Sequence, residues 1–397
     1  MAAGIAARLG LGAAFRGSFP FFVLLYGALY AAFGTESPFL PSFLGDRGLS
    51  SGEIGLVLAA GTLVRLVAGP VAGQIADRYG ATRWVLAIAA AAAGLISFAY
   101  LAAESFWLLL AVSMIHSVAI SALAPLADAL ALGAAEREGT FAYGWVRGAG
   151  SAAFILGTLV SGQLVAQAGL ASIIVASGIL FLAMAGAATR VPPAPAATGD
   201  ATVMAEGLRV LLAIPLFRRL LLVAALVIGS HALNDAFAVI RWREAGLAPG
   251  TISLLWSEAV ASEVLVFVLV GPWLLKRIGT AKAALLAAAL GVARWSVMAL
   301  TTAVPLLAVS QLSHGLTFAL LHLANMRLIG EIAPDRWAAT AQSLYGTLGL
   351  GLASAGLTLA SGALFAHLGG GAFWIMAALC LLALPFAATL HGPAERA

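Results

Sequence analysis

Long apolar stretches constrain the fold of this chain more than any other feature. A helix needs about 18 consecutive apolar residues to cross a bilayer, and many stretches of the 397-residue sequence exceed that length. Charged residues make up only 10% of the chain, whereas soluble proteins carry about a quarter. The ten-residue alternation typical of a membrane β-barrel does not occur. The sequence therefore predicts an all-α protein that crosses a membrane many times.

Twelve transmembrane helices are expected. They are placed near 19–44, 53–75, 83–103, 106–132, 141–167, 170–188, 217–243, 251–275, 281–302, 305–330, 337–367 and 370–391. The first apolar stretch has no convincing cleavage site, so we interpret it as a retained helix rather than a signal peptide. The single cysteine, Cys380, lies in an apolar run, which excludes a role for disulfides.

The positive charges predict the orientation of these helices. With both termini inside, fifteen of the 21 Lys and Arg residues lie on the inner side, three on the outer side and three within helices. Cytoplasmic loops carry such an excess. We therefore expect both termini in the cytoplasm, and the net charge of +4 reflects this orientation rather than binding of nucleic acid.

The middle of the chain interrupts the apolar pattern. Residues 191–200 are rich in proline and too polar to span a membrane, and a short surface helix near 203–213 follows them. The predicted domains are an N-terminal six-helix bundle at 1–190, a cytoplasmic linker at 191–215 and a C-terminal six-helix bundle at 216–397.

A polar turn between the second and third apolar stretches reads Gly-x-x-x-Asp-Arg-x-Gly-x-x-Arg. A weaker copy follows 199 residues later, with Gly279 where the first has Gly80 and Lys276 where the first has Asp77. One turn and its copy, half a chain apart, indicate two halves of similar plan. The first turn resembles the signature loop of the major facilitator transporters. That resemblance implies a gating loop made of Gly73, Asp77, Arg78, Gly80 and Arg83.

Two charges lie inside the first two predicted helices. Glu36 lies about eight residues from the outer end of its helix, and Arg65 about a dozen residues into the next. A lone charge at that depth costs at least about 2.5–3.5 kcal/mol, so both should face the bundle interior and could neutralise each other. Either they form a structural ion pair, or Glu36 binds and releases protons.

Further charged and polar residues occupy matched depths on neighbouring helices. Asp128 and Arg147 lie at similar depths in the fourth and fifth helices, which indicates a pair or a shared ligand. Arg294 and His314 also lie at similar depths, in the ninth and tenth helices. A metal site at His314 and His322 has poor ligand geometry, and we expect no metal.

Several runs resemble the 3-phenylpropionate permease branch of the major facilitator superfamily, and beyond it lactose permease. They are 229–235 with Trp242, 124–128, Arg294-Trp295 and 311–322. The resemblance implies that Asp128 and Arg147 bind substrate, and that Arg294 and His314 serve ligand recognition and proton coupling. It also implies a bacterial inner-membrane location, two six-helix bundles and alternating access.

The chain departs from lactose permease at two positions. That family has an essential acid three residues after the histidine, where this chain has Thr317. The proton carrier must then be another acid, with Glu263 as first choice and Glu36 and Asp235 after it. Phe154 replaces a tryptophan that stacks on sugar, which favours an apolar or aromatic ligand.

The main hypothesis is a secondary active transporter that couples protons to symport of a small organic solute such as an aromatic carboxylate. A sugar or nucleoside symporter and a drug or metabolite exporter remain alternatives. An enzyme is disfavoured, since neither Gly-x-Ser-x-Gly nor His-Glu-x-x-His occurs. A receptor or scaffold would not need six charges within the membrane. The expected partners are the solute, protons and lipid, with no cofactor, and the protein is expected to be a monomer.

Overall fold

The structure is a computed structural model that describes residues 17–193 and 204–392. The described residues form helices joined by short turns, with no strand among them. They cluster into two compact units, Met1–Phe43 with Val64–Gly199 and Leu44–Leu63 with Asp200–Ala397. Residues 44–63, predicted in the first bundle, therefore cluster with the second unit. Residues 194–203, which include most of the proline-rich run, lie outside the described residues.

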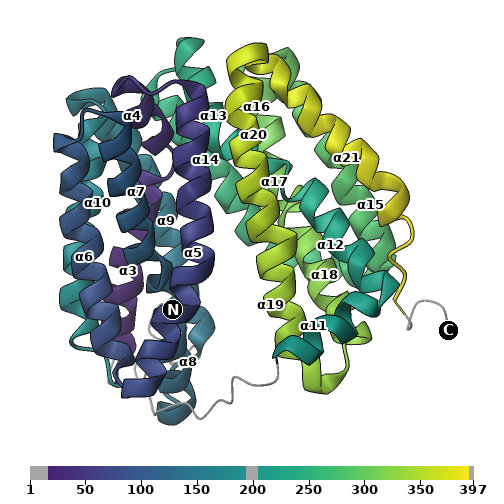
Figure 1. Ribbon diagram of the computed structural model, residues 1–397, viewed down its shortest axis with the longest axis horizontal. Coiled ribbons are helices and arrows are strands. Elements are labelled where there is room, and N and C mark those ends of the chain that lie inside the picture. Colours follow the sequence, from purple (N-terminus) through teal and green to yellow (C-terminus); the bar gives the residue numbers. More distant parts are fainter. Residues whose placement is uncertain (1–16, 194–203, 393–397) are drawn as a thin grey trace, which may run out of the picture. The chain divides into compact units, whose positions relative to one another are not determined.

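The first part of the chain supplies eight helices among the residues described (Figure 1). They are α3 (Phe19–Glu36), α4 (Leu40–Asp46), α5 (Ser51–Tyr79), α6 (Thr82–Ala102), α7 (Phe106–Ser121), α8 (Leu123–Glu138), α9 (Tyr143–Ala168) and α10 (Ala171–Ala188). The predicted helix 19–44 is thus divided after Glu36, because Pro38 has no N–H to continue the helical ladder.

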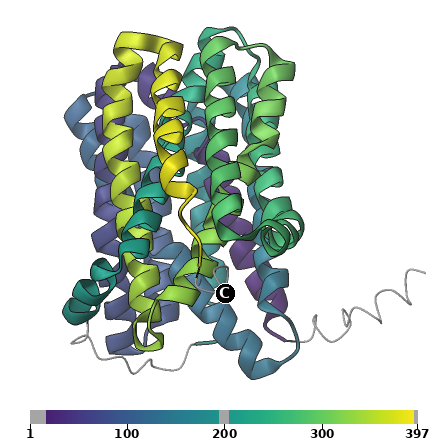
Figure 2. The ribbon, with the colours of Figure 1, turned by 90° about the vertical axis from the view of Figure 1, so that its right-hand side faces the viewer.

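The second part of the chain also consists of helices, but they are interrupted more often (Figure 2). Its α-helices are α11 (Met204–Ala213), α12 (Pro215–Val227), α13 (His231–Glu244), α14 (Pro249–Leu265), α15 (Gly271–Leu300), α16 (Val304–Leu312), α17 (His314–Thr317), α18 (Ala319–Ile332), α19 (Ala338–Leu344), α20 (Ala353–Leu368) and α21 (Phe373–Ala387). Two π-helical turns, Val266–Val270 and Tyr345–Leu352, continue α14 and α19, and 3-10 turns at Asp335–Trp337 and Gly369–Ala372 precede α19 and α21.

Within the part of the chain that the structure describes, all twelve predicted spans fall in ten helical stretches long and apolar enough to cross a membrane. Two stretches, Pro249–Leu300 and Asp335–Ala387, are 52 and 53 residues long and each contain two predicted spans. In the first, Gly279 has φ 78° and divides α15 at the predicted turn. The second is divided at Gly369, where φ is 52°. The all-α membrane fold predicted from the sequence is confirmed.

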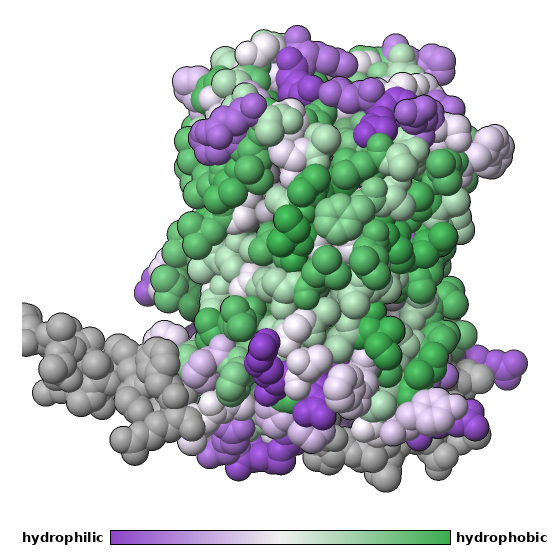
Figure 3. Space-filling view, turned by 90° about the vertical axis from the view of Figure 1, so that its left-hand side faces the viewer, coloured by the Kyte–Doolittle hydropathy of each residue, from purple (hydrophilic) through white to green (hydrophobic). Residues whose placement is uncertain are grey.

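The outer surface of the first unit suits a lipid environment. Ile88 and Leu95 of α6 are 68% and 64% exposed, and Ile179 of α10 is 56% exposed. Figure 3 shows a broad hydrophobic band on this face, with hydrophilic residues gathered at its two edges. In water such a surface would be costly, whereas hydrocarbon solvates it.

Helices α3 and α9 approach each other through glycine. A Cβ on Gly34 would lie 2.1 Å from the carbonyl oxygen of Phe154, and one on Gly157 would lie 2.5 Å from that of Ala31. Thr158 Oγ1 donates to the carbonyl of Gly34 at 3.0 Å across the same contact. Small residues let helices pack closely in lipid, where no hydrophobic force drives association. This contact fixes the position of Glu36, two residues after Gly34.

Candidate functional site

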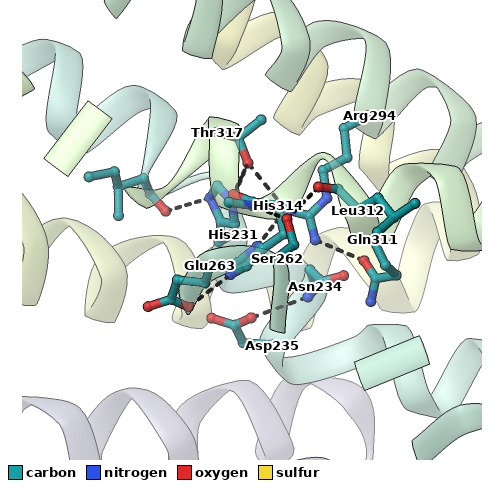
Figure 4. A network of polar contacts seen from close by, with 12 residues as sticks. His231, Asn234, Asp235, Ser262, Glu263, Arg294, Gln311, Leu312, His314 and Thr317 are labelled. Atoms are coloured by element: carbon teal, nitrogen blue, oxygen red, sulfur yellow. Dashed lines mark hydrogen bonds and ion pairs between the residues drawn. The ribbon is translucent and has the colours of Figure 1, made fainter. Parts of the chain in front are cut away.

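A buried arginine organises a polar network in the second unit (Figure 4). Arg294 of α15 is 2% exposed. Its Nη1 donates to His314 Nδ1 at 2.7 Å and to Thr317 Oγ1 at 3.3 Å, and its Nη2 donates to Gln311 Oε1 at 2.9 Å. All three acceptors are neutral groups from α16 and α17. The two terminal nitrogens are therefore hydrogen-bonded, Nε is buried without a partner among the described residues, and these neutral partners do not cancel the charge.

The arginine fixes the tautomer of His314. A guanidinium can only donate, so Nδ1 of His314 must be the unprotonated nitrogen and Nε2 must carry the hydrogen. Nε2 lies 3.4 Å from Oε2 of Glu263 on α14. The imidazole thus connects Arg294 on one side with the Glu263 carboxylate on the other. The structure brings together the three residues that the sequence analysis assigned to recognition and proton coupling.

Helix breaks create this arrangement. The tenth predicted span is interrupted at Ser313, between α16 and α17, and again at Phe318. Ser262 Oγ of α14 donates to the carbonyl of Leu312 at 2.5 Å and accepts from the N–H of Gly315 at 3.2 Å. Ser262 therefore satisfies backbone groups freed by the break, and it places its neighbour Glu263 beside His314. In many transporters, the substrate or coupling ion binds where a transmembrane helix is discontinuous, because the break frees backbone groups.

His231 of α13 is a member of the network that the sequence analysis did not assign. Its Nδ1 lies 3.1 Å from the carbonyl oxygens of Val227 and Ile228, so Nδ1 carries the hydrogen. Its Nε2 lies 3.1 Å from the hydroxyl oxygen of Thr317, whose hydrogen is directed at the carbonyl of His314. The histidine is 3% exposed. Its position in a polar run of an otherwise apolar helix is the sequence feature that could have identified it.

Asp235 lies one turn after His231 and completes the acidic side of the site. Asn234 Nδ2 donates to its Oδ1 at 3.2 Å. Unlike Asn234, the aspartate is exposed. Asp235 and Glu263 lie within electrostatic reach of each other, and Figure 4 shows both below the histidines. Two acids on separate helices, α13 and α14, thus border one buried cation.

In the first unit, Asp128 binds tyrosines rather than an arginine. The Tyr26 hydroxyl donates to Asp128 Oδ1 at 2.5 Å, and the hydroxyl of Tyr143 also interacts with this carboxylate. Arg147 lies over the ring of Tyr30, with 4.6 Å from Cζ to the ring centroid. Among the described residues no carboxylate lies within 4 Å of Arg147. Its side chain is exposed, and three tyrosines surround the predicted substrate pair.

Three aromatic residues near Arg147 and Arg294 in the sequence differ in their exposure. Phe154 of α9 is half-buried, and its backbone packs against Gly34. Trp145 is 54% exposed. Trp295 is enclosed, since it is 0% exposed, its Nε1 donates to Ser230 at 2.8 Å, and it stacks with Phe373. Trp295 is therefore part of the core in this structure rather than a surface for a ligand.

Glu36 lies beside a histidine with which no pairing was predicted. Its Oε1 lies 3.7 Å from Nδ1 of His116 on α7. Arg65 lies within electrostatic reach of Glu36, and their direct pairing stays a prediction. No role was predicted for His116 from the sequence.

The residues of the predicted gating loop lie around the turn between α5 and α6: Gly73, Asp77 and Arg78 end α5, Gly80 lies in the turn, and Arg83 begins α6. Gly80 has φ 57°, which favours glycine. Asp77 and Arg78 are exposed, Gly73 is partly buried, and Arg83 Nη1 donates to the carbonyl of Val191 at 3.3 Å. The role of this loop stays a prediction.

The described residues contain no group of three or more His, Cys, Asp or Glu that could hold a metal ion. Nδ1 of His322 instead lies 3.2 Å from the hydroxyl of Tyr345.

Buried, hydrogen-bonded charges within apolar transmembrane helices are typical of polytopic membrane transporters. Within that class this chain is a member of the MFS_1 like family, whose model matches residues 21–376. It is 31% identical to the "Probable 3-phenylpropionic acid transporter" of Escherichia coli (strain K12) over 368 residues, which cover 91% of this chain and 94% of that protein.

Other similar proteins are named for different solutes. The maltose permease of Geobacillus stearothermophilus is 29% identical over 362 residues, 91% of each chain. The crystal structure of the nucleoside transporter NupG matches with a TM-score of 0.82 at 16% identity, over 93% of this chain and 98% of that one. The relatives and neighbours are transporters rather than enzymes, so the chain is a multi-pass membrane transporter of the major facilitator type.

Proposed function

We propose that this protein is a proton-coupled symporter that carries a small aromatic carboxylate across the bacterial inner membrane by alternating access. The observation that carries the proposal is Arg147. It is an exposed cation on a transmembrane helix, it lies on the face of Tyr30, and no described carboxylate pairs with it. Guanidinium binds carboxylate with two parallel hydrogen bonds. Tyr26, Tyr30 and Tyr143 supply the aromatic surroundings for the rest of the solute.

The two arginines have different tasks in this proposal. Arg294 already donates to three neutral acceptors and is 2% exposed. A substrate carboxylate could reach it only by displacing those bonds. Arg147 therefore holds the substrate, and Arg294 holds His314 in the tautomer that faces Glu263.

The proton step uses Glu263. When ionised, this carboxylate accepts the Nε2 hydrogen of His314, 3.4 Å away. When protonated, it loses its charge and its attraction for that hydrogen. Protonation from the outer side and release inside would then alternate these two states. Asp235 borders the same site and is the second candidate for the proton.

A second candidate function is symport of a sugar or nucleoside. It is favoured by the acceptor at Asp128 beside the donor at Arg147, since hydroxyl groups need both. The maltose permease and the nucleoside transporter among the similar proteins support it.

The test is uptake of labelled 3-phenylpropionate into proteoliposomes with and without an inward proton gradient. We expect gradient-driven accumulation in the wild type and its loss in Glu263→Gln. Arg147→Lys keeps the charge and loses the fork, so substrate affinity should fall by at least about tenfold, since a hydrogen bond to a charged group contributes about 1.5–3 kcal/mol. The control is Arg190→Lys, an exposed arginine at the end of α10.

Three results would count against the proposal. Uptake that survives Glu263→Gln would move the proton to Asp235 or Glu36. An unchanged affinity in Arg147→Lys would remove the substrate role of that residue. Gradient-driven uptake of maltose or uridine without uptake of the aromatic acid would select the second candidate.

A further inference from the structure

Glu36 and His116 form a buried pair in the first unit, far along the chain from Arg294, His314 and Glu263. Glu36 is the last residue of α3 and is 5% exposed, and His116 of α7 is 2% exposed. Their Oε1 and Nδ1 atoms are 3.7 Å apart. The rings of Tyr100 and Phe181 meet the imidazole edge-on, at 5.7 and 5.8 Å between centroids. The pair therefore lies in dry surroundings, where the position of a proton decides the charge.

The hydrogen bonds around His116 determine which nitrogen carries a hydrogen. Its Nε2 lies 3.3 Å from the hydroxyl oxygen of Ser97 on α6. That hydroxyl donates its one hydrogen to the carbonyl of Ala93, at 2.9 Å. Ser97 can therefore only accept from the histidine, so Nε2 carries a hydrogen. In a neutral His116, Nδ1 would then present its lone pair to Glu36.

This geometry requires a proton between the two groups. A lone pair on Nδ1 facing an ionised carboxylate would be repulsive. Either His116 is an imidazolium whose Nδ1–H faces the carboxylate, or Glu36 is a carboxylic acid whose hydrogen faces Nδ1. Both arrangements have the same total charge and hold one proton. The other carboxylate oxygen, Oε2, is buried with no hydrogen-bond partner among the described residues.

The neighbouring groups allow this proton to leave. Arg65 of α5 lies within electrostatic reach of Glu36 and its residue is exposed. Tyr100 of α6 also faces Glu36 and donates to Ser113 at 3.0 Å. When the proton departs, the pair carries one negative charge, and the guanidinium of Arg65 offsets it. The residues of the first unit thus stabilise the Glu36–His116 pair both with and without its shared proton.

We propose that Glu36 and His116 are a second proton-binding site of this protein, which holds one shared proton and is separate from the site at Glu263. Its use during transport rests on the proposed proton coupling, but the shared proton itself does not. The contact of α3 with α9 connects this pair to the helix that carries Arg147, because Gly34 packs on the backbone of Phe154. A change of charge at Glu36 would act on that contact.

The test follows the ring nitrogens of His116 by NMR in the full-length protein, labelled at histidine nitrogen and reconstituted in lipid nanodiscs. His116→Gln assigns the signal. Two groups that share one proton depend on each other for their protonation state. We therefore expect Glu36→Gln to shift the Nδ1 signal of His116 at neutral pH, because the carboxylate that shares the proton is gone. Glu104→Gln, at an exposed turn, should leave it unchanged.

The second variant keeps the carboxylate in place. Ser97→Ala removes the acceptor of the Nε2 hydrogen, and we expect the neutral Nδ1–H form, which faces Glu36, to appear. An unchanged Nδ1 signal in Glu36→Gln, or a neutral Nδ1–H form already in the wild type, would overturn the proposal. These spectra need no substrate. A wild type without proton-driven uptake would therefore refute the proposed function and leave the shared proton to be decided by the spectra.

Discussion

At the scale of single residues, the two units handle their arginines in opposite ways. Arg294 is enclosed and donates to three neutral groups, whereas Arg147 is exposed and lies against an aromatic ring. The acid beside each arginine is also used differently. Asp128 accepts from Tyr26, and Glu263 faces the Nε2 hydrogen of His314. Whether a buried charge can bind a substrate therefore depends on the neutral groups that surround it, and not on its depth in the membrane alone.

The role of His314 as the connection between Arg294 and Glu263 can be tested by substitution. Asparagine at this position places an acceptor oxygen near the location of Nδ1 and lacks the donor at Nε2. We expect His314→Asn to keep most of the thermal stability, because Arg294 retains an acceptor, and to lose proton-driven accumulation. Exchange of substrate without a gradient should continue. A leucine at the same position leaves the guanidinium short of a partner, which costs about 1–3 kcal/mol, so His314→Leu should melt at lower temperature.

At the scale of helices, glycine allows two pairs of helices to pack with their backbones in direct contact. The α3–α9 contact has no room for a Cβ on Gly34 or Gly157. The α14–α17 contact is equally tight, since a Cβ on Gly315 would lie 2.4 Å from the carbonyl oxygen of Ser262. Both contacts lie beside an ionisable group, Glu36 in the first case and Glu263 in the second. Close backbone packing therefore sets the positions of both acids.

The α3–α9 contact leads to a prediction with a control in the same helix. Gly157→Ala forces the helices apart, and overpacking costs about 1–3 kcal/mol. Gly144→Ala meets nothing within 4 Å, and alanine is the better helix former by about 0.5–1 kcal/mol. We expect Gly157→Ala to lower the melting temperature in detergent and Gly144→Ala to leave it unchanged or raise it. Equal melting temperatures would mean that α3 and α9 are less closely packed than described.

At the scale of the whole molecule, the transmembrane helices follow from the sequence, but the breaks within them do not. Apolar length and polar turns predicted every span. The sequence placed Arg294 and His314 at similar depths, and the structure shows that they are in contact. Periodicity gives the face of a helix. It does not give the hydrogen-bond partners, so Gln311, His231 and the tyrosines around Asp128 were missed. The breaks at Ser313 and Ile228–Ser230 depend on tertiary contacts, such as the one from Ser262, that no local pattern encodes.

The orientation of the chain gives a prediction at this scale. Cys380 is the single cysteine and is buried, so introduced cysteines can be labelled with little background. Glu104 and Thr140 are both exposed and lie in turns expected on opposite sides. In intact cells a membrane-impermeant maleimide should label Glu104→Cys, and Thr140→Cys should react only after permeabilisation. The reverse result would invert the topology that the positive charges predict.

The contact between α3 and α9 also bears on how the protein is made. Thr158 bonds to Gly34 across 124 residues of sequence, and His116 is synthesised long after Glu36. At about 5–20 residues per second, the first transmembrane helix waits on the order of ten seconds for both partners. During that time its acid has neither the histidine nor the glycine face against it. During this interval, we expect the insertion machinery or a membrane chaperone to keep Glu36 of the newly inserted α3 away from lipid.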